Sequence, residues 1–317
     1  MPVSRHLTTH IWSFPMLKSV RWAAKALVAG AVFVTASHAA ELTIDTAKGP
    51  ESVPATPARI AVFDIAAIDT LSALGVPIVG IPQPYYVAYL DDVAKSATPI
   101  GTLFEPDFEA LANLEPDLIV AGGRSSSQVD ALARIAPTVD MTIWGDDHIS
   151  QALSRLDAYG KLMDLEEKAA ELKADFEQKL ATARAAIEGK GNALIILTNG
   201  PKISAYGAGS RFGWIHNELA LPEAKEGVDA QTHGEAISFE FIAEVNPDWL
   251  IVIDRGAAIG AEGESAAETL DNELVRETQA WKNGHVVFVD AGRIYVAGGG
   301  IQAVSGTLDE LIAAFGG

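Results

Sequence analysis

Three arginines follow short apolar segments that the sequence predicts to be strands. Arg124, Arg211 and Arg255 all lie in Gly- or Ser-containing stretches just beyond these segments, and His233 and Tyr295 lie in predicted loops of the second half. A guanidinium group keeps its positive charge, donates two parallel hydrogen bonds to paired oxygens and stacks on aromatic rings. Three such groups can therefore bind an anion. Each residue alone has a plainer explanation: a solvated surface charge for Arg, a packed side chain for His or Tyr. Their joint position after strands favours a binding cleft.

A duplicated stretch places two of these arginines. Phe108–Arg124 reads FEALANLEPDLIVAGGR, and in the second half of the chain Phe239–Arg255 reads FEFIAEVNPDWLIVIDR. In both copies Pro-Asp ends a short amphipathic run, an apolar run follows, and Arg comes just past its end. This pattern predicts a helix, a turn, a buried strand and a loop at the strand's carboxyl end, where open α/β sheets bind ligands. Two copies predict two similar lobes, each offering one cation to a shared site.

The expected fold class is α/β, with two similar three-layer lobes of mainly parallel sheet joined by one long rigid helix and a ligand cleft between them. We expect a first lobe over residues 40–164, a connecting helix over 165–189 and a second lobe over 190–317. Met163-Asp164 is predicted to break the helical stretch before the connecting helix. Arg293–Tyr295 is predicted as an edge strand or loop. The aromatic loop Gln83–Tyr89 could line the cleft or pack on its own lobe.

The N-terminal segment, residues 1–39, has the features of an export signal. Lys18, Arg21 and Lys25 precede the apolar run Ala26–Thr35, and Ser37-His38-Ala39 offers small residues for cleavage. The apolar run is shorter than the roughly 20 residues that span a bilayer. Met1 or Met16 could be the true start. The chain contains no cysteine, which excludes disulfides, a thiolate metal site and a lipid anchor on the mature chain. We therefore expect a free, monomeric periplasmic protein.

The chain after residue 40 is strongly acidic. It holds 19 of the 23 basic residues and all 42 acidic ones, a net charge of −23. This balance excludes a nucleic-acid or anionic-membrane binder. It also makes a local cluster of arginines informative, because the cluster runs against the charge of the whole chain.

Catalytic motifs are missing from the sequence. There is no Gly-x-Ser-x-Gly, no His-Glu-x-x-His and no phosphate-binding Walker loop, and Gly207-Ala-Gly209 begins a dinucleotide motif whose third glycine comes one position late at Gly213. A carrier of bare metal ions is disfavoured because the histidines are scattered along the chain. A periplasmic enzyme on an anionic substrate, and a haem or cobalamin carrier, remain as alternatives, although a large ring does not call for three arginines.

Five short motifs carry a resemblance to a known family. They are Val62-Phe-Asp-Ile-Ala-Ala-Ile-Asp-Thr-Leu71, Gly209-Ser-Arg-Phe-Gly213, Thr232-His-Gly234, Asn246-Pro-Asp248 and Ile253-Asp-Arg-Gly-Ala-Ala258. With these motifs the whole mature chain resembles the periplasmic ferric-siderophore binding proteins of ABC importers, and most closely the branch that binds catecholates. The resemblance implies a binding protein with no enzymatic activity and no intrinsic cofactor, which carries Fe(III) as a siderophore complex.

The resemblance also implies roles for individual residues. Three arginines hold the anionic ligand in that branch, and they match Arg124, Arg211 and Arg255. A histidine and a tyrosine complete the iron coordination, and they match His233 and Tyr295. One exposed glutamate per lobe docks on the membrane permease, which implies this role for Glu109 and Glu240, the second residues of the two repeat copies. A carboxylate there also complements the positive end of a helix, and that alone could explain both.

Overall fold

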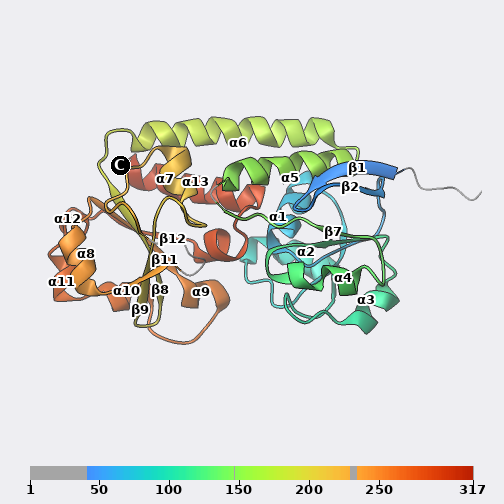
Figure 1. Ribbon diagram of the computed structural model, residues 1–317, viewed down its shortest axis with the longest axis horizontal. Helices are drawn as coiled ribbons and strands as arrows, with labels where there is room; N and C mark the ends of the chain where they lie inside the picture. Colours follow the sequence, from blue (N-terminus) through green and yellow to red (C-terminus); the bar gives the residue numbers. More distant parts are fainter. Residues whose placement is uncertain (1–40, 146, 229–233, 317) are drawn as a thin grey trace, which may run out of the picture. The chain divides into compact units, whose positions relative to one another are not determined.

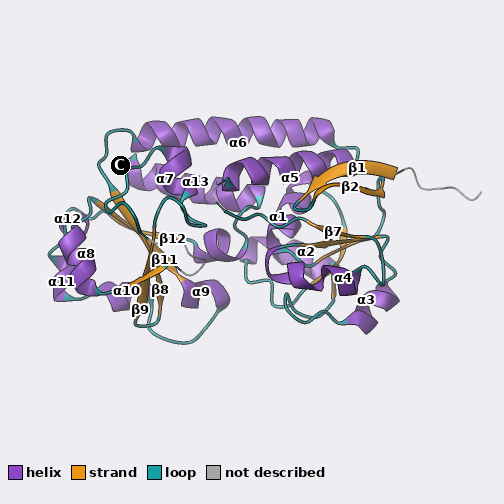
Figure 2. Ribbon diagram, viewed as in Figure 1, coloured by secondary structure: helices purple, strands orange, loops and turns teal. Residues whose placement is uncertain are grey.

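In the computed structural model, residues 41–145, 147–228 and 234–316 are described, and they form two five-stranded sheets and one hairpin (Figures 1 and 2). The first sheet is parallel throughout, and its strands in spatial order are β5 (Thr98–Pro99), β4 (Ile78–Ile81), β3 (Ile60–Val62), β6 (Leu118–Ala121) and β7 (Thr138–Asp140). The second sheet has the order β10 (Glu235–Ile237), β9 (Lys202–Tyr206), β8 (Ala193–Asn199), β11 (Trp249–Asp254) and β12 (Val286–Val289). Its last three strands are parallel, whereas β9 is antiparallel to both neighbours.

Helices and strands alternate along most of the chain. The described part begins with an antiparallel hairpin of β1 (Glu41–Thr46) and β2 (Gly49–Pro54). The helical segments that come before the second sheet are α1 (Ile65–Leu74), η1 (Ala88–Leu90), α2 (Asp91–Ser96), α3 (Phe108–Leu114), η2 (Gly123–Gln128), α4 (Val129–Leu132), α5 (His148–Leu162) and α6 (Glu166–Ile187). The helical segments that come after β8 in the sequence are α7 (Trp214–Leu219), α8 (Phe239–Val245), α9 (Arg255–Ile259), α10 (Ala266–Leu270), α11 (Glu273–Arg276), α12 (Gln279–Lys282), η3 (Gly292–Val296) and α13 (Ile301–Phe315). Within the described ranges, no helix is long and apolar enough to cross a bilayer.

Both sheets are buried on both faces, which makes each a three-layer structure. Along β6, Leu118 and Val120 pack into one apolar cluster, whereas Ile119 and Ala121 pack into another on the opposite face. Strand β11 alternates between two clusters in the same way. Continuous apolar strands of this kind are typical of parallel sheets covered by helices on each side. The predicted α/β class with two lobes of mainly parallel sheet is confirmed.

The duplicated stretch forms the same unit twice, as predicted. Asp107 caps α3 by accepting a hydrogen bond from the N–H of Ala110, and Ser238 caps α8 at the equivalent position. Both helices end on a left-handed residue, Glu115 with φ 48° and Asn246 with φ 46°. Each helix leads through Pro-Asp into a central strand, β6 or β11. The two units therefore share caps, turn and strand, and not only sequence.

Helix α6 lies in sequence between the two sheets and runs along α5 and α13 (Figure 1). Its 22 residues span about 33 Å at 1.5 Å per residue. Asp164, with φ 57°, separates it from α5, as predicted for the break at Met163-Asp164. One face of α6 is buried, and this face consists of Ala169, Phe176, Leu180, Ala183 and Ile187.

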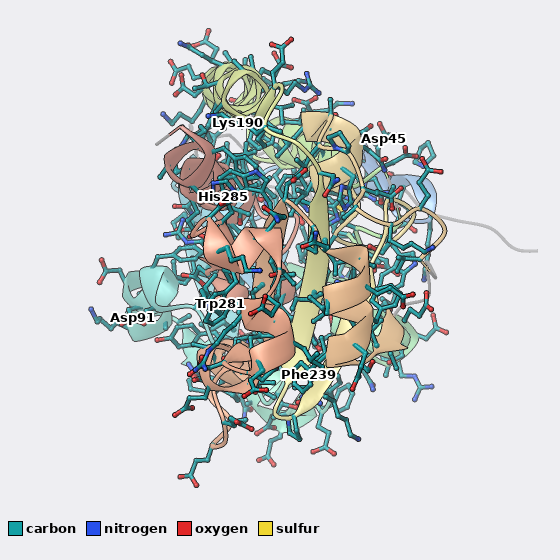
Figure 3. All side chains as sticks on the ribbon, turned by 90° about the vertical axis from the view of Figure 1, so that its left-hand side faces the viewer. Asp45, Asp91, Lys190, Phe239, Trp281 and His285 are labelled. Atoms are coloured by element: carbon teal, nitrogen blue, oxygen red, sulfur yellow. The ribbon has the colours of Figure 1, made fainter. Side chains whose placement is uncertain are left out.

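One apolar cluster runs through both halves of the described chain. It contains residues of β3 and β6 from the first sheet, β8 and β11 from the second, and the buried faces of α6 and α13. In the second half, which faces the viewer in Figure 3, the Trp249 ring stacks on His285 and on Phe315, with centroid distances of 3.9 Å in both cases. The two sheets thus share one core along the side covered by α6 and α13.

Candidate functional site

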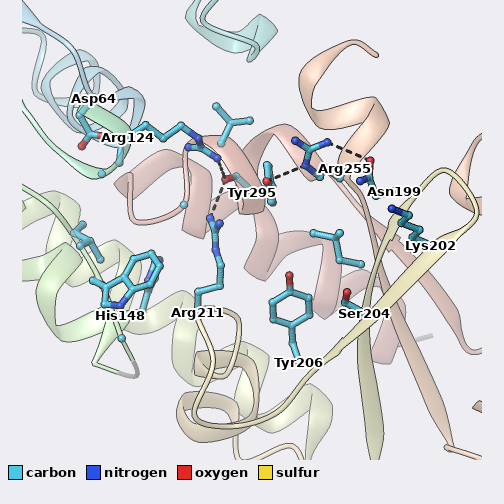
Figure 4. Close-up of a pocket in the computed structure, with 18 residues that line it drawn as sticks. Asp64, Arg124, His148, Asn199, Lys202, Ser204, Tyr206, Arg211, Arg255 and Tyr295 are labelled. Atoms are coloured by element: carbon cyan, nitrogen blue, oxygen red, sulfur yellow. Dashed lines mark hydrogen bonds between the residues drawn. The ribbon is translucent and has the colours of Figure 1, made fainter. Parts of the chain in front are cut away.

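A cavity of about 570 Å³ opens at the carboxyl ends of the central strands and is lined by residues of both halves (Figure 4). Arg124 comes from the first half, and Arg211, Arg255 and Tyr295 come from the second. The structure thus brings together four of the five side chains that the sequence predicts for ligand and metal binding. The fifth, His233, lies outside the described residues.

The two arginines of the duplicated unit begin short helical segments rather than lying in loops. Arg124 is the second residue of the 3-10 segment η2, just after β6, and Arg255 is the first residue of α9, just after β11. Asp254 caps α9 by accepting a hydrogen bond from the N–H of Ala257. The loop prediction is therefore wrong for both residues, although their position past the strand ends is as predicted. Arg211 lies in the turn between β9 and α7.

Tyr295 lies in a π-helical turn, η3, and not in the edge strand or loop that the sequence predicts. The alternation of buried Ile294 and Val296 around it resembles a strand. The backbone instead closes a wide turn, because the N–H of Ala297 donates to the carbonyl of Gly292, five residues earlier. Such single wide turns are frequent at functional sites. The turn holds the half-buried Tyr295 against the cavity.

All three arginines contact Tyr295. Arg124 and Arg211 each donate an Nη2 hydrogen bond to its backbone carbonyl, at 3.1 and 2.9 Å, as the dashed lines in Figure 4 mark. Their guanidinium carbons lie 5.3 and 4.9 Å from the centroid of its ring. Cations at this distance are attracted by the ring face. One tyrosine therefore holds two like charges from different halves of the chain side by side.

Arg255 contacts the phenol itself. Its Nε donates to the Tyr295 Oη at 3.1 Å, and its Nη1 donates to Asn199 Oδ1 at 3.1 Å. Burial acts to raise the pKa of the Tyr295 phenol, but the hydrogen bond from Arg255 and the charges of all three arginines outweigh burial and lower that pKa below its usual value. This arrangement makes the phenolate, the form that can bind a metal ion, easier to form than in a free tyrosine.

Two other ionisable groups line the cavity. Burial raises the pKa of Asp64 to about 6, although backbone N–H groups and the Arg124 charge oppose the rise. Burial and the nearby Arg211 lower the pKa of His148 to about 4, so its imidazole is neutral at pH 7. The ring of His148 stacks on Trp214 with 13° between the planes. A neutral imidazole can accept a hydrogen bond or bind a metal.

Several residues that line the cavity are not among those predicted from the sequence. Asp64 comes two residues after the end of β3 and Asn199 is the last residue of β8, so the rule that placed the arginines could have found both. Lys202 and Trp144 also line the cavity, and Trp144 is 53% exposed. The position of His148 depends on how α5 packs, for which the sequence carries no local signal.

The remaining predicted residues lie away from the cavity. Glu109 and Glu240 are both exposed, in the first turns of α3 and α8. Hydrogen bonds from the Ser238 side chain and from its own backbone N–H lower the pKa of Glu240. Within the described ranges, no cluster of three or more His, Asp or Glu side chains could hold a metal ion.

The aromatic loop Gln83–Tyr89 supplies none of the described residues that line the cavity. The Tyr85 hydroxyl donates to Asp91 at 2.6 Å, and the Tyr89 hydroxyl donates to Asp69 at 2.6 Å. Of the two readings that the sequence leaves open, packing on the lobe is the one found here.

The chain is similar to known proteins in sequence and in structure. Residues 60–292 match the model of the family Peripla_BP_2, described as periplasmic binding protein. The petrobactin-binding protein YclQ of Bacillus subtilis is 35% identical over 268 residues, which cover 83% of this chain and 84% of YclQ. The ferric-anguibactin-binding protein FatB of Vibrio anguillarum is 29% identical over 281 residues, covering 86% and 87%.

Solved structures agree with the sequence matches. The crystal structure of YclQ superimposes with a TM-score of 0.82 and 32% identity, covering 87% of this chain and 99% of that one. The catecholate-siderophore binding protein VctP of Vibrio cholerae gives a TM-score of 0.78 at 28% identity, covering 87% and 99%. These relatives are substrate-binding proteins and not enzymes. The chain accordingly belongs to the Peripla_BP_2 family of periplasmic binding proteins.

Proposed function

We propose that this protein captures a ferric siderophore of the catecholate class in the arginine-lined cavity and delivers it to an ABC importer for iron uptake. The observation that carries the proposal is the convergence of Arg124, Arg211 and Arg255 on Tyr295. A ferric bis-catecholate is anionic and has flat aromatic rings, so guanidinium groups can both hydrogen-bond to its oxygens and stack on its rings. The cavity volume of about 570 Å³ is in the range of small-ligand sites.

The charge of the whole chain supports a local rather than a long-range attraction. At a net charge of −23 beyond residue 40, the protein repels an anion at a distance. The three clustered cations therefore have to supply the attraction inside the cavity. Among the relatives, VctP is a catecholate-siderophore binding protein, which supports the catecholate class, and FatB binds ferric anguibactin, which supports an iron complex as the ligand.

Iron coordination gives Tyr295 a specific part in this function. Fe(III) is a hard cation that takes about six ligands, mostly oxygen, and a tetradentate bis-catecholate supplies only four. In our proposal the Tyr295 phenolate and the His233 imidazole fill the two remaining positions. The lowered pKa of Tyr295 supports this part, because less free energy is needed to form the phenolate at neutral pH.

A titration with ferric mono-, bis- and tris-catecholates tests the proposal. We expect binding with a visible charge-transfer band, and the band of the tetradentate complex should shift in Tyr295→Phe. Tyr206→Phe is a matched control, because this hydroxyl also lines the cavity but has no part in the proposed coordination. An unchanged spectrum in Tyr295→Phe would exclude its role as an iron ligand, and absence of binding to all three complexes would exclude the catecholate class.

Delivery to the importer completes the proposal. Residues 1–39 would act as the export signal, and the mature chain would be a free monomer in the periplasm. It would dock on the membrane permease through Glu109 and Glu240. Two observations support the docking role: both glutamates are exposed, and they hold the same place in the duplicated unit. A two-fold symmetric permease could then receive one carboxylate in each half.

A further inference from the structure

Tyr295 and the start of α13 are held by the first half of the chain. Only a short connection separates Tyr295 from Ile301, the first residue of α13, and η3 packs against α13. The N-cap position of α13 is Gly300, which has no side chain to satisfy the free N–H groups of the first turn. Those N–H groups are satisfied from α1 instead.

Asp69 and Thr70 of α1 act as the cap of α13. Asp69 Oδ1 accepts from the N–H of Gln302 at 2.8 Å, and Oδ2 accepts from the N–H of Ala303 at 3.0 Å. Thr70 Oγ1 accepts from the N–H of Ile301 at 3.2 Å. The side chain of Asp69 is fully buried and that of Thr70 almost so, at 0% and 2% exposure. A buried carboxylate from the opposite end of the chain thus replaces a local cap.

The same carboxylate is connected to η3 by a second route. The Tyr89 hydroxyl donates to Asp69 Oδ2 at 2.6 Å, and the Arg293 guanidinium lies 5.2 Å from the centroid of the Tyr89 ring. Arg293 is two residues before Tyr295 in η3. Asp69 therefore contacts the segment that follows Tyr295 directly, and the segment that precedes it through Tyr89.

The fit between the two segments is close. A Cβ atom on Gly300 would lie 2.5 Å from Asp69 Cγ, so only glycine allows the carboxylate to approach the helix end. The backbone oxygen of Asp69 also accepts a hydrogen bond from the Gln302 side chain at 2.8 Å. These contacts leave the start of α13 little freedom to move relative to α1.

We infer that Asp69 is a positioning residue for Tyr295: it fixes η3 against the first half of the chain, so that the phenol meets the iron in the geometry that a tetradentate complex needs. The inference rests on the proposed function, because it takes Tyr295 as an iron ligand. Asp69 does not itself line the cavity, so it acts on the ligand only through the segment that it holds.

The experiment compares two ferric complexes on the mature protein, a synthetic tetradentate bis-catecholate and a hexadentate tris-catecholate. Asp69→Asn should weaken the tetradentate complex about tenfold and move its visible band toward that of Tyr295→Phe. The hexadentate complex already has six ligands, so its affinity should change by less than about twofold. Tyr89→Phe, which removes one hydroxyl and leaves the carboxylate, should act in the same direction with a smaller loss.

A control variant and a double variant test whether the effect of Asp69→Asn is specific to Tyr295. Asp91→Asn is the matched control, because it removes a carboxylate that accepts an equally short tyrosine hydrogen bond, at 2.6 Å, outside the α13 cap, and it should leave both complexes unchanged. In the Tyr295→Phe background, Asp69→Asn should cause no further loss.

Losses that multiply in the double variant would overturn the positioning role while leaving Tyr295 as a ligand. If Tyr295→Phe alone changes neither affinity nor spectrum, the coordination assigned to it under the proposed function fails, and the role of Asp69 fails with it. If Asp69→Asn does not fold, Tyr89→Phe decides: an unshifted band and full affinity there would overturn the inference.

Discussion

Arg255 and Tyr295 are joined by a hydrogen bond from the guanidinium Nε to the phenol Oη, at 3.1 Å. Because α9 carries one partner and η3 the other, two separate segments meet at the atom proposed to bind iron. The bond lowers the pKa of the phenol and also occupies its oxygen. The bound iron would therefore take a position next to Arg255, whose charge then faces the ligand oxygens.

Removing Arg255 should raise the pKa of Tyr295. In Arg255→Ala the phenol loses a hydrogen bond and the nearest positive charge, while burial still disfavours the phenolate. An ultraviolet titration of the ligand-free protein, compared with Tyr295→Phe to isolate this one phenol, should show it ionising at higher pH than in the wild type. Arg255→Lys keeps the charge and should show a smaller rise. An equal or lower phenol pKa in Arg255→Ala would contradict this account.

Arg124 and Arg211 should each contribute to ligand affinity. Their replacement by Ala should cost on the order of 1–3 kcal/mol for a ferric bis-catecholate, the range of hydrogen bonds to charged groups. Lysine at either position should restore only part of the lost affinity, because an ammonium group makes no bidentate hydrogen bond and does not stack well on aromatic rings. Arg134→Ala, which removes an exposed arginine that does not line the cavity, is the control for net charge. Equal losses in all three alanine variants would show that only the overall charge matters.

Asp64 should make stability depend on pH. Burial raises its folded-state pKa from 3.8 to about 6, so the folded protein binds this proton more tightly than the unfolded chain does. The contribution is therefore fully present below about pH 3.8 and is lost as the pH rises through 6. Asp64→Asn should gain stability relative to the wild type over this window, by up to about 3 kcal/mol.

Thermal unfolding of both proteins from pH 4 to 7.5 measures this difference. Asp69→Asn offers a comparison, because burial raises the pKa of Asp69 to about 7 and the window should extend one unit higher. A difference between wild type and Asp64→Asn that stays constant over the whole range would refute the prediction.

Docking should depend on both exposed glutamates and be separable from binding. The double variant Glu109→Ala, Glu240→Ala should bind the ferric ligand as the wild type does, because neither side chain lines the cavity. It should fail to support uptake in cells that contain the importer. Glu244→Ala, an exposed carboxylate on the same helix α8, is the control and should transport normally. Normal uptake by the double variant would leave these carboxylates only their favourable interaction with the positive ends of α3 and α8.

The sequence predicts best those features that depend on local pattern. The helix, turn and strand of the duplicated unit follow from it, because caps, Pro-Asp and an apolar run are all encoded within one short stretch. Arg124 and Arg255 follow from that unit, since each comes just past the carboxyl end of a central strand, where open α/β sheets bind their ligands. The break at Asp164 also follows from a few neighbouring residues.

Features that depend on distant contacts cannot be predicted in this way. The pattern of η3 is misleading, because buried Ile294 and Val296 alternate as in a strand, whereas packing against α13 and α9 determines the backbone. Nothing in the sequence near Asp69 indicates that it caps the last helix of the chain. His148 reaches the cavity only because α5 packs beside Trp214. Such positions are set by tertiary structure, for which a single sequence has no local code.

The apolar cluster shared by both sheets has a consequence for signalling. Swinging the lobes apart would expose the buried faces of α6 and α13 to water, at roughly 25 cal/mol for each Å². In the proposed function, this cost opposes a wide opening and closing of the lobes as the signal that iron is bound. The importer of the proposed function would instead recognise the loaded protein from small shifts of η2, η3 and α9, and its own conformational change would supply the free energy for ligand release.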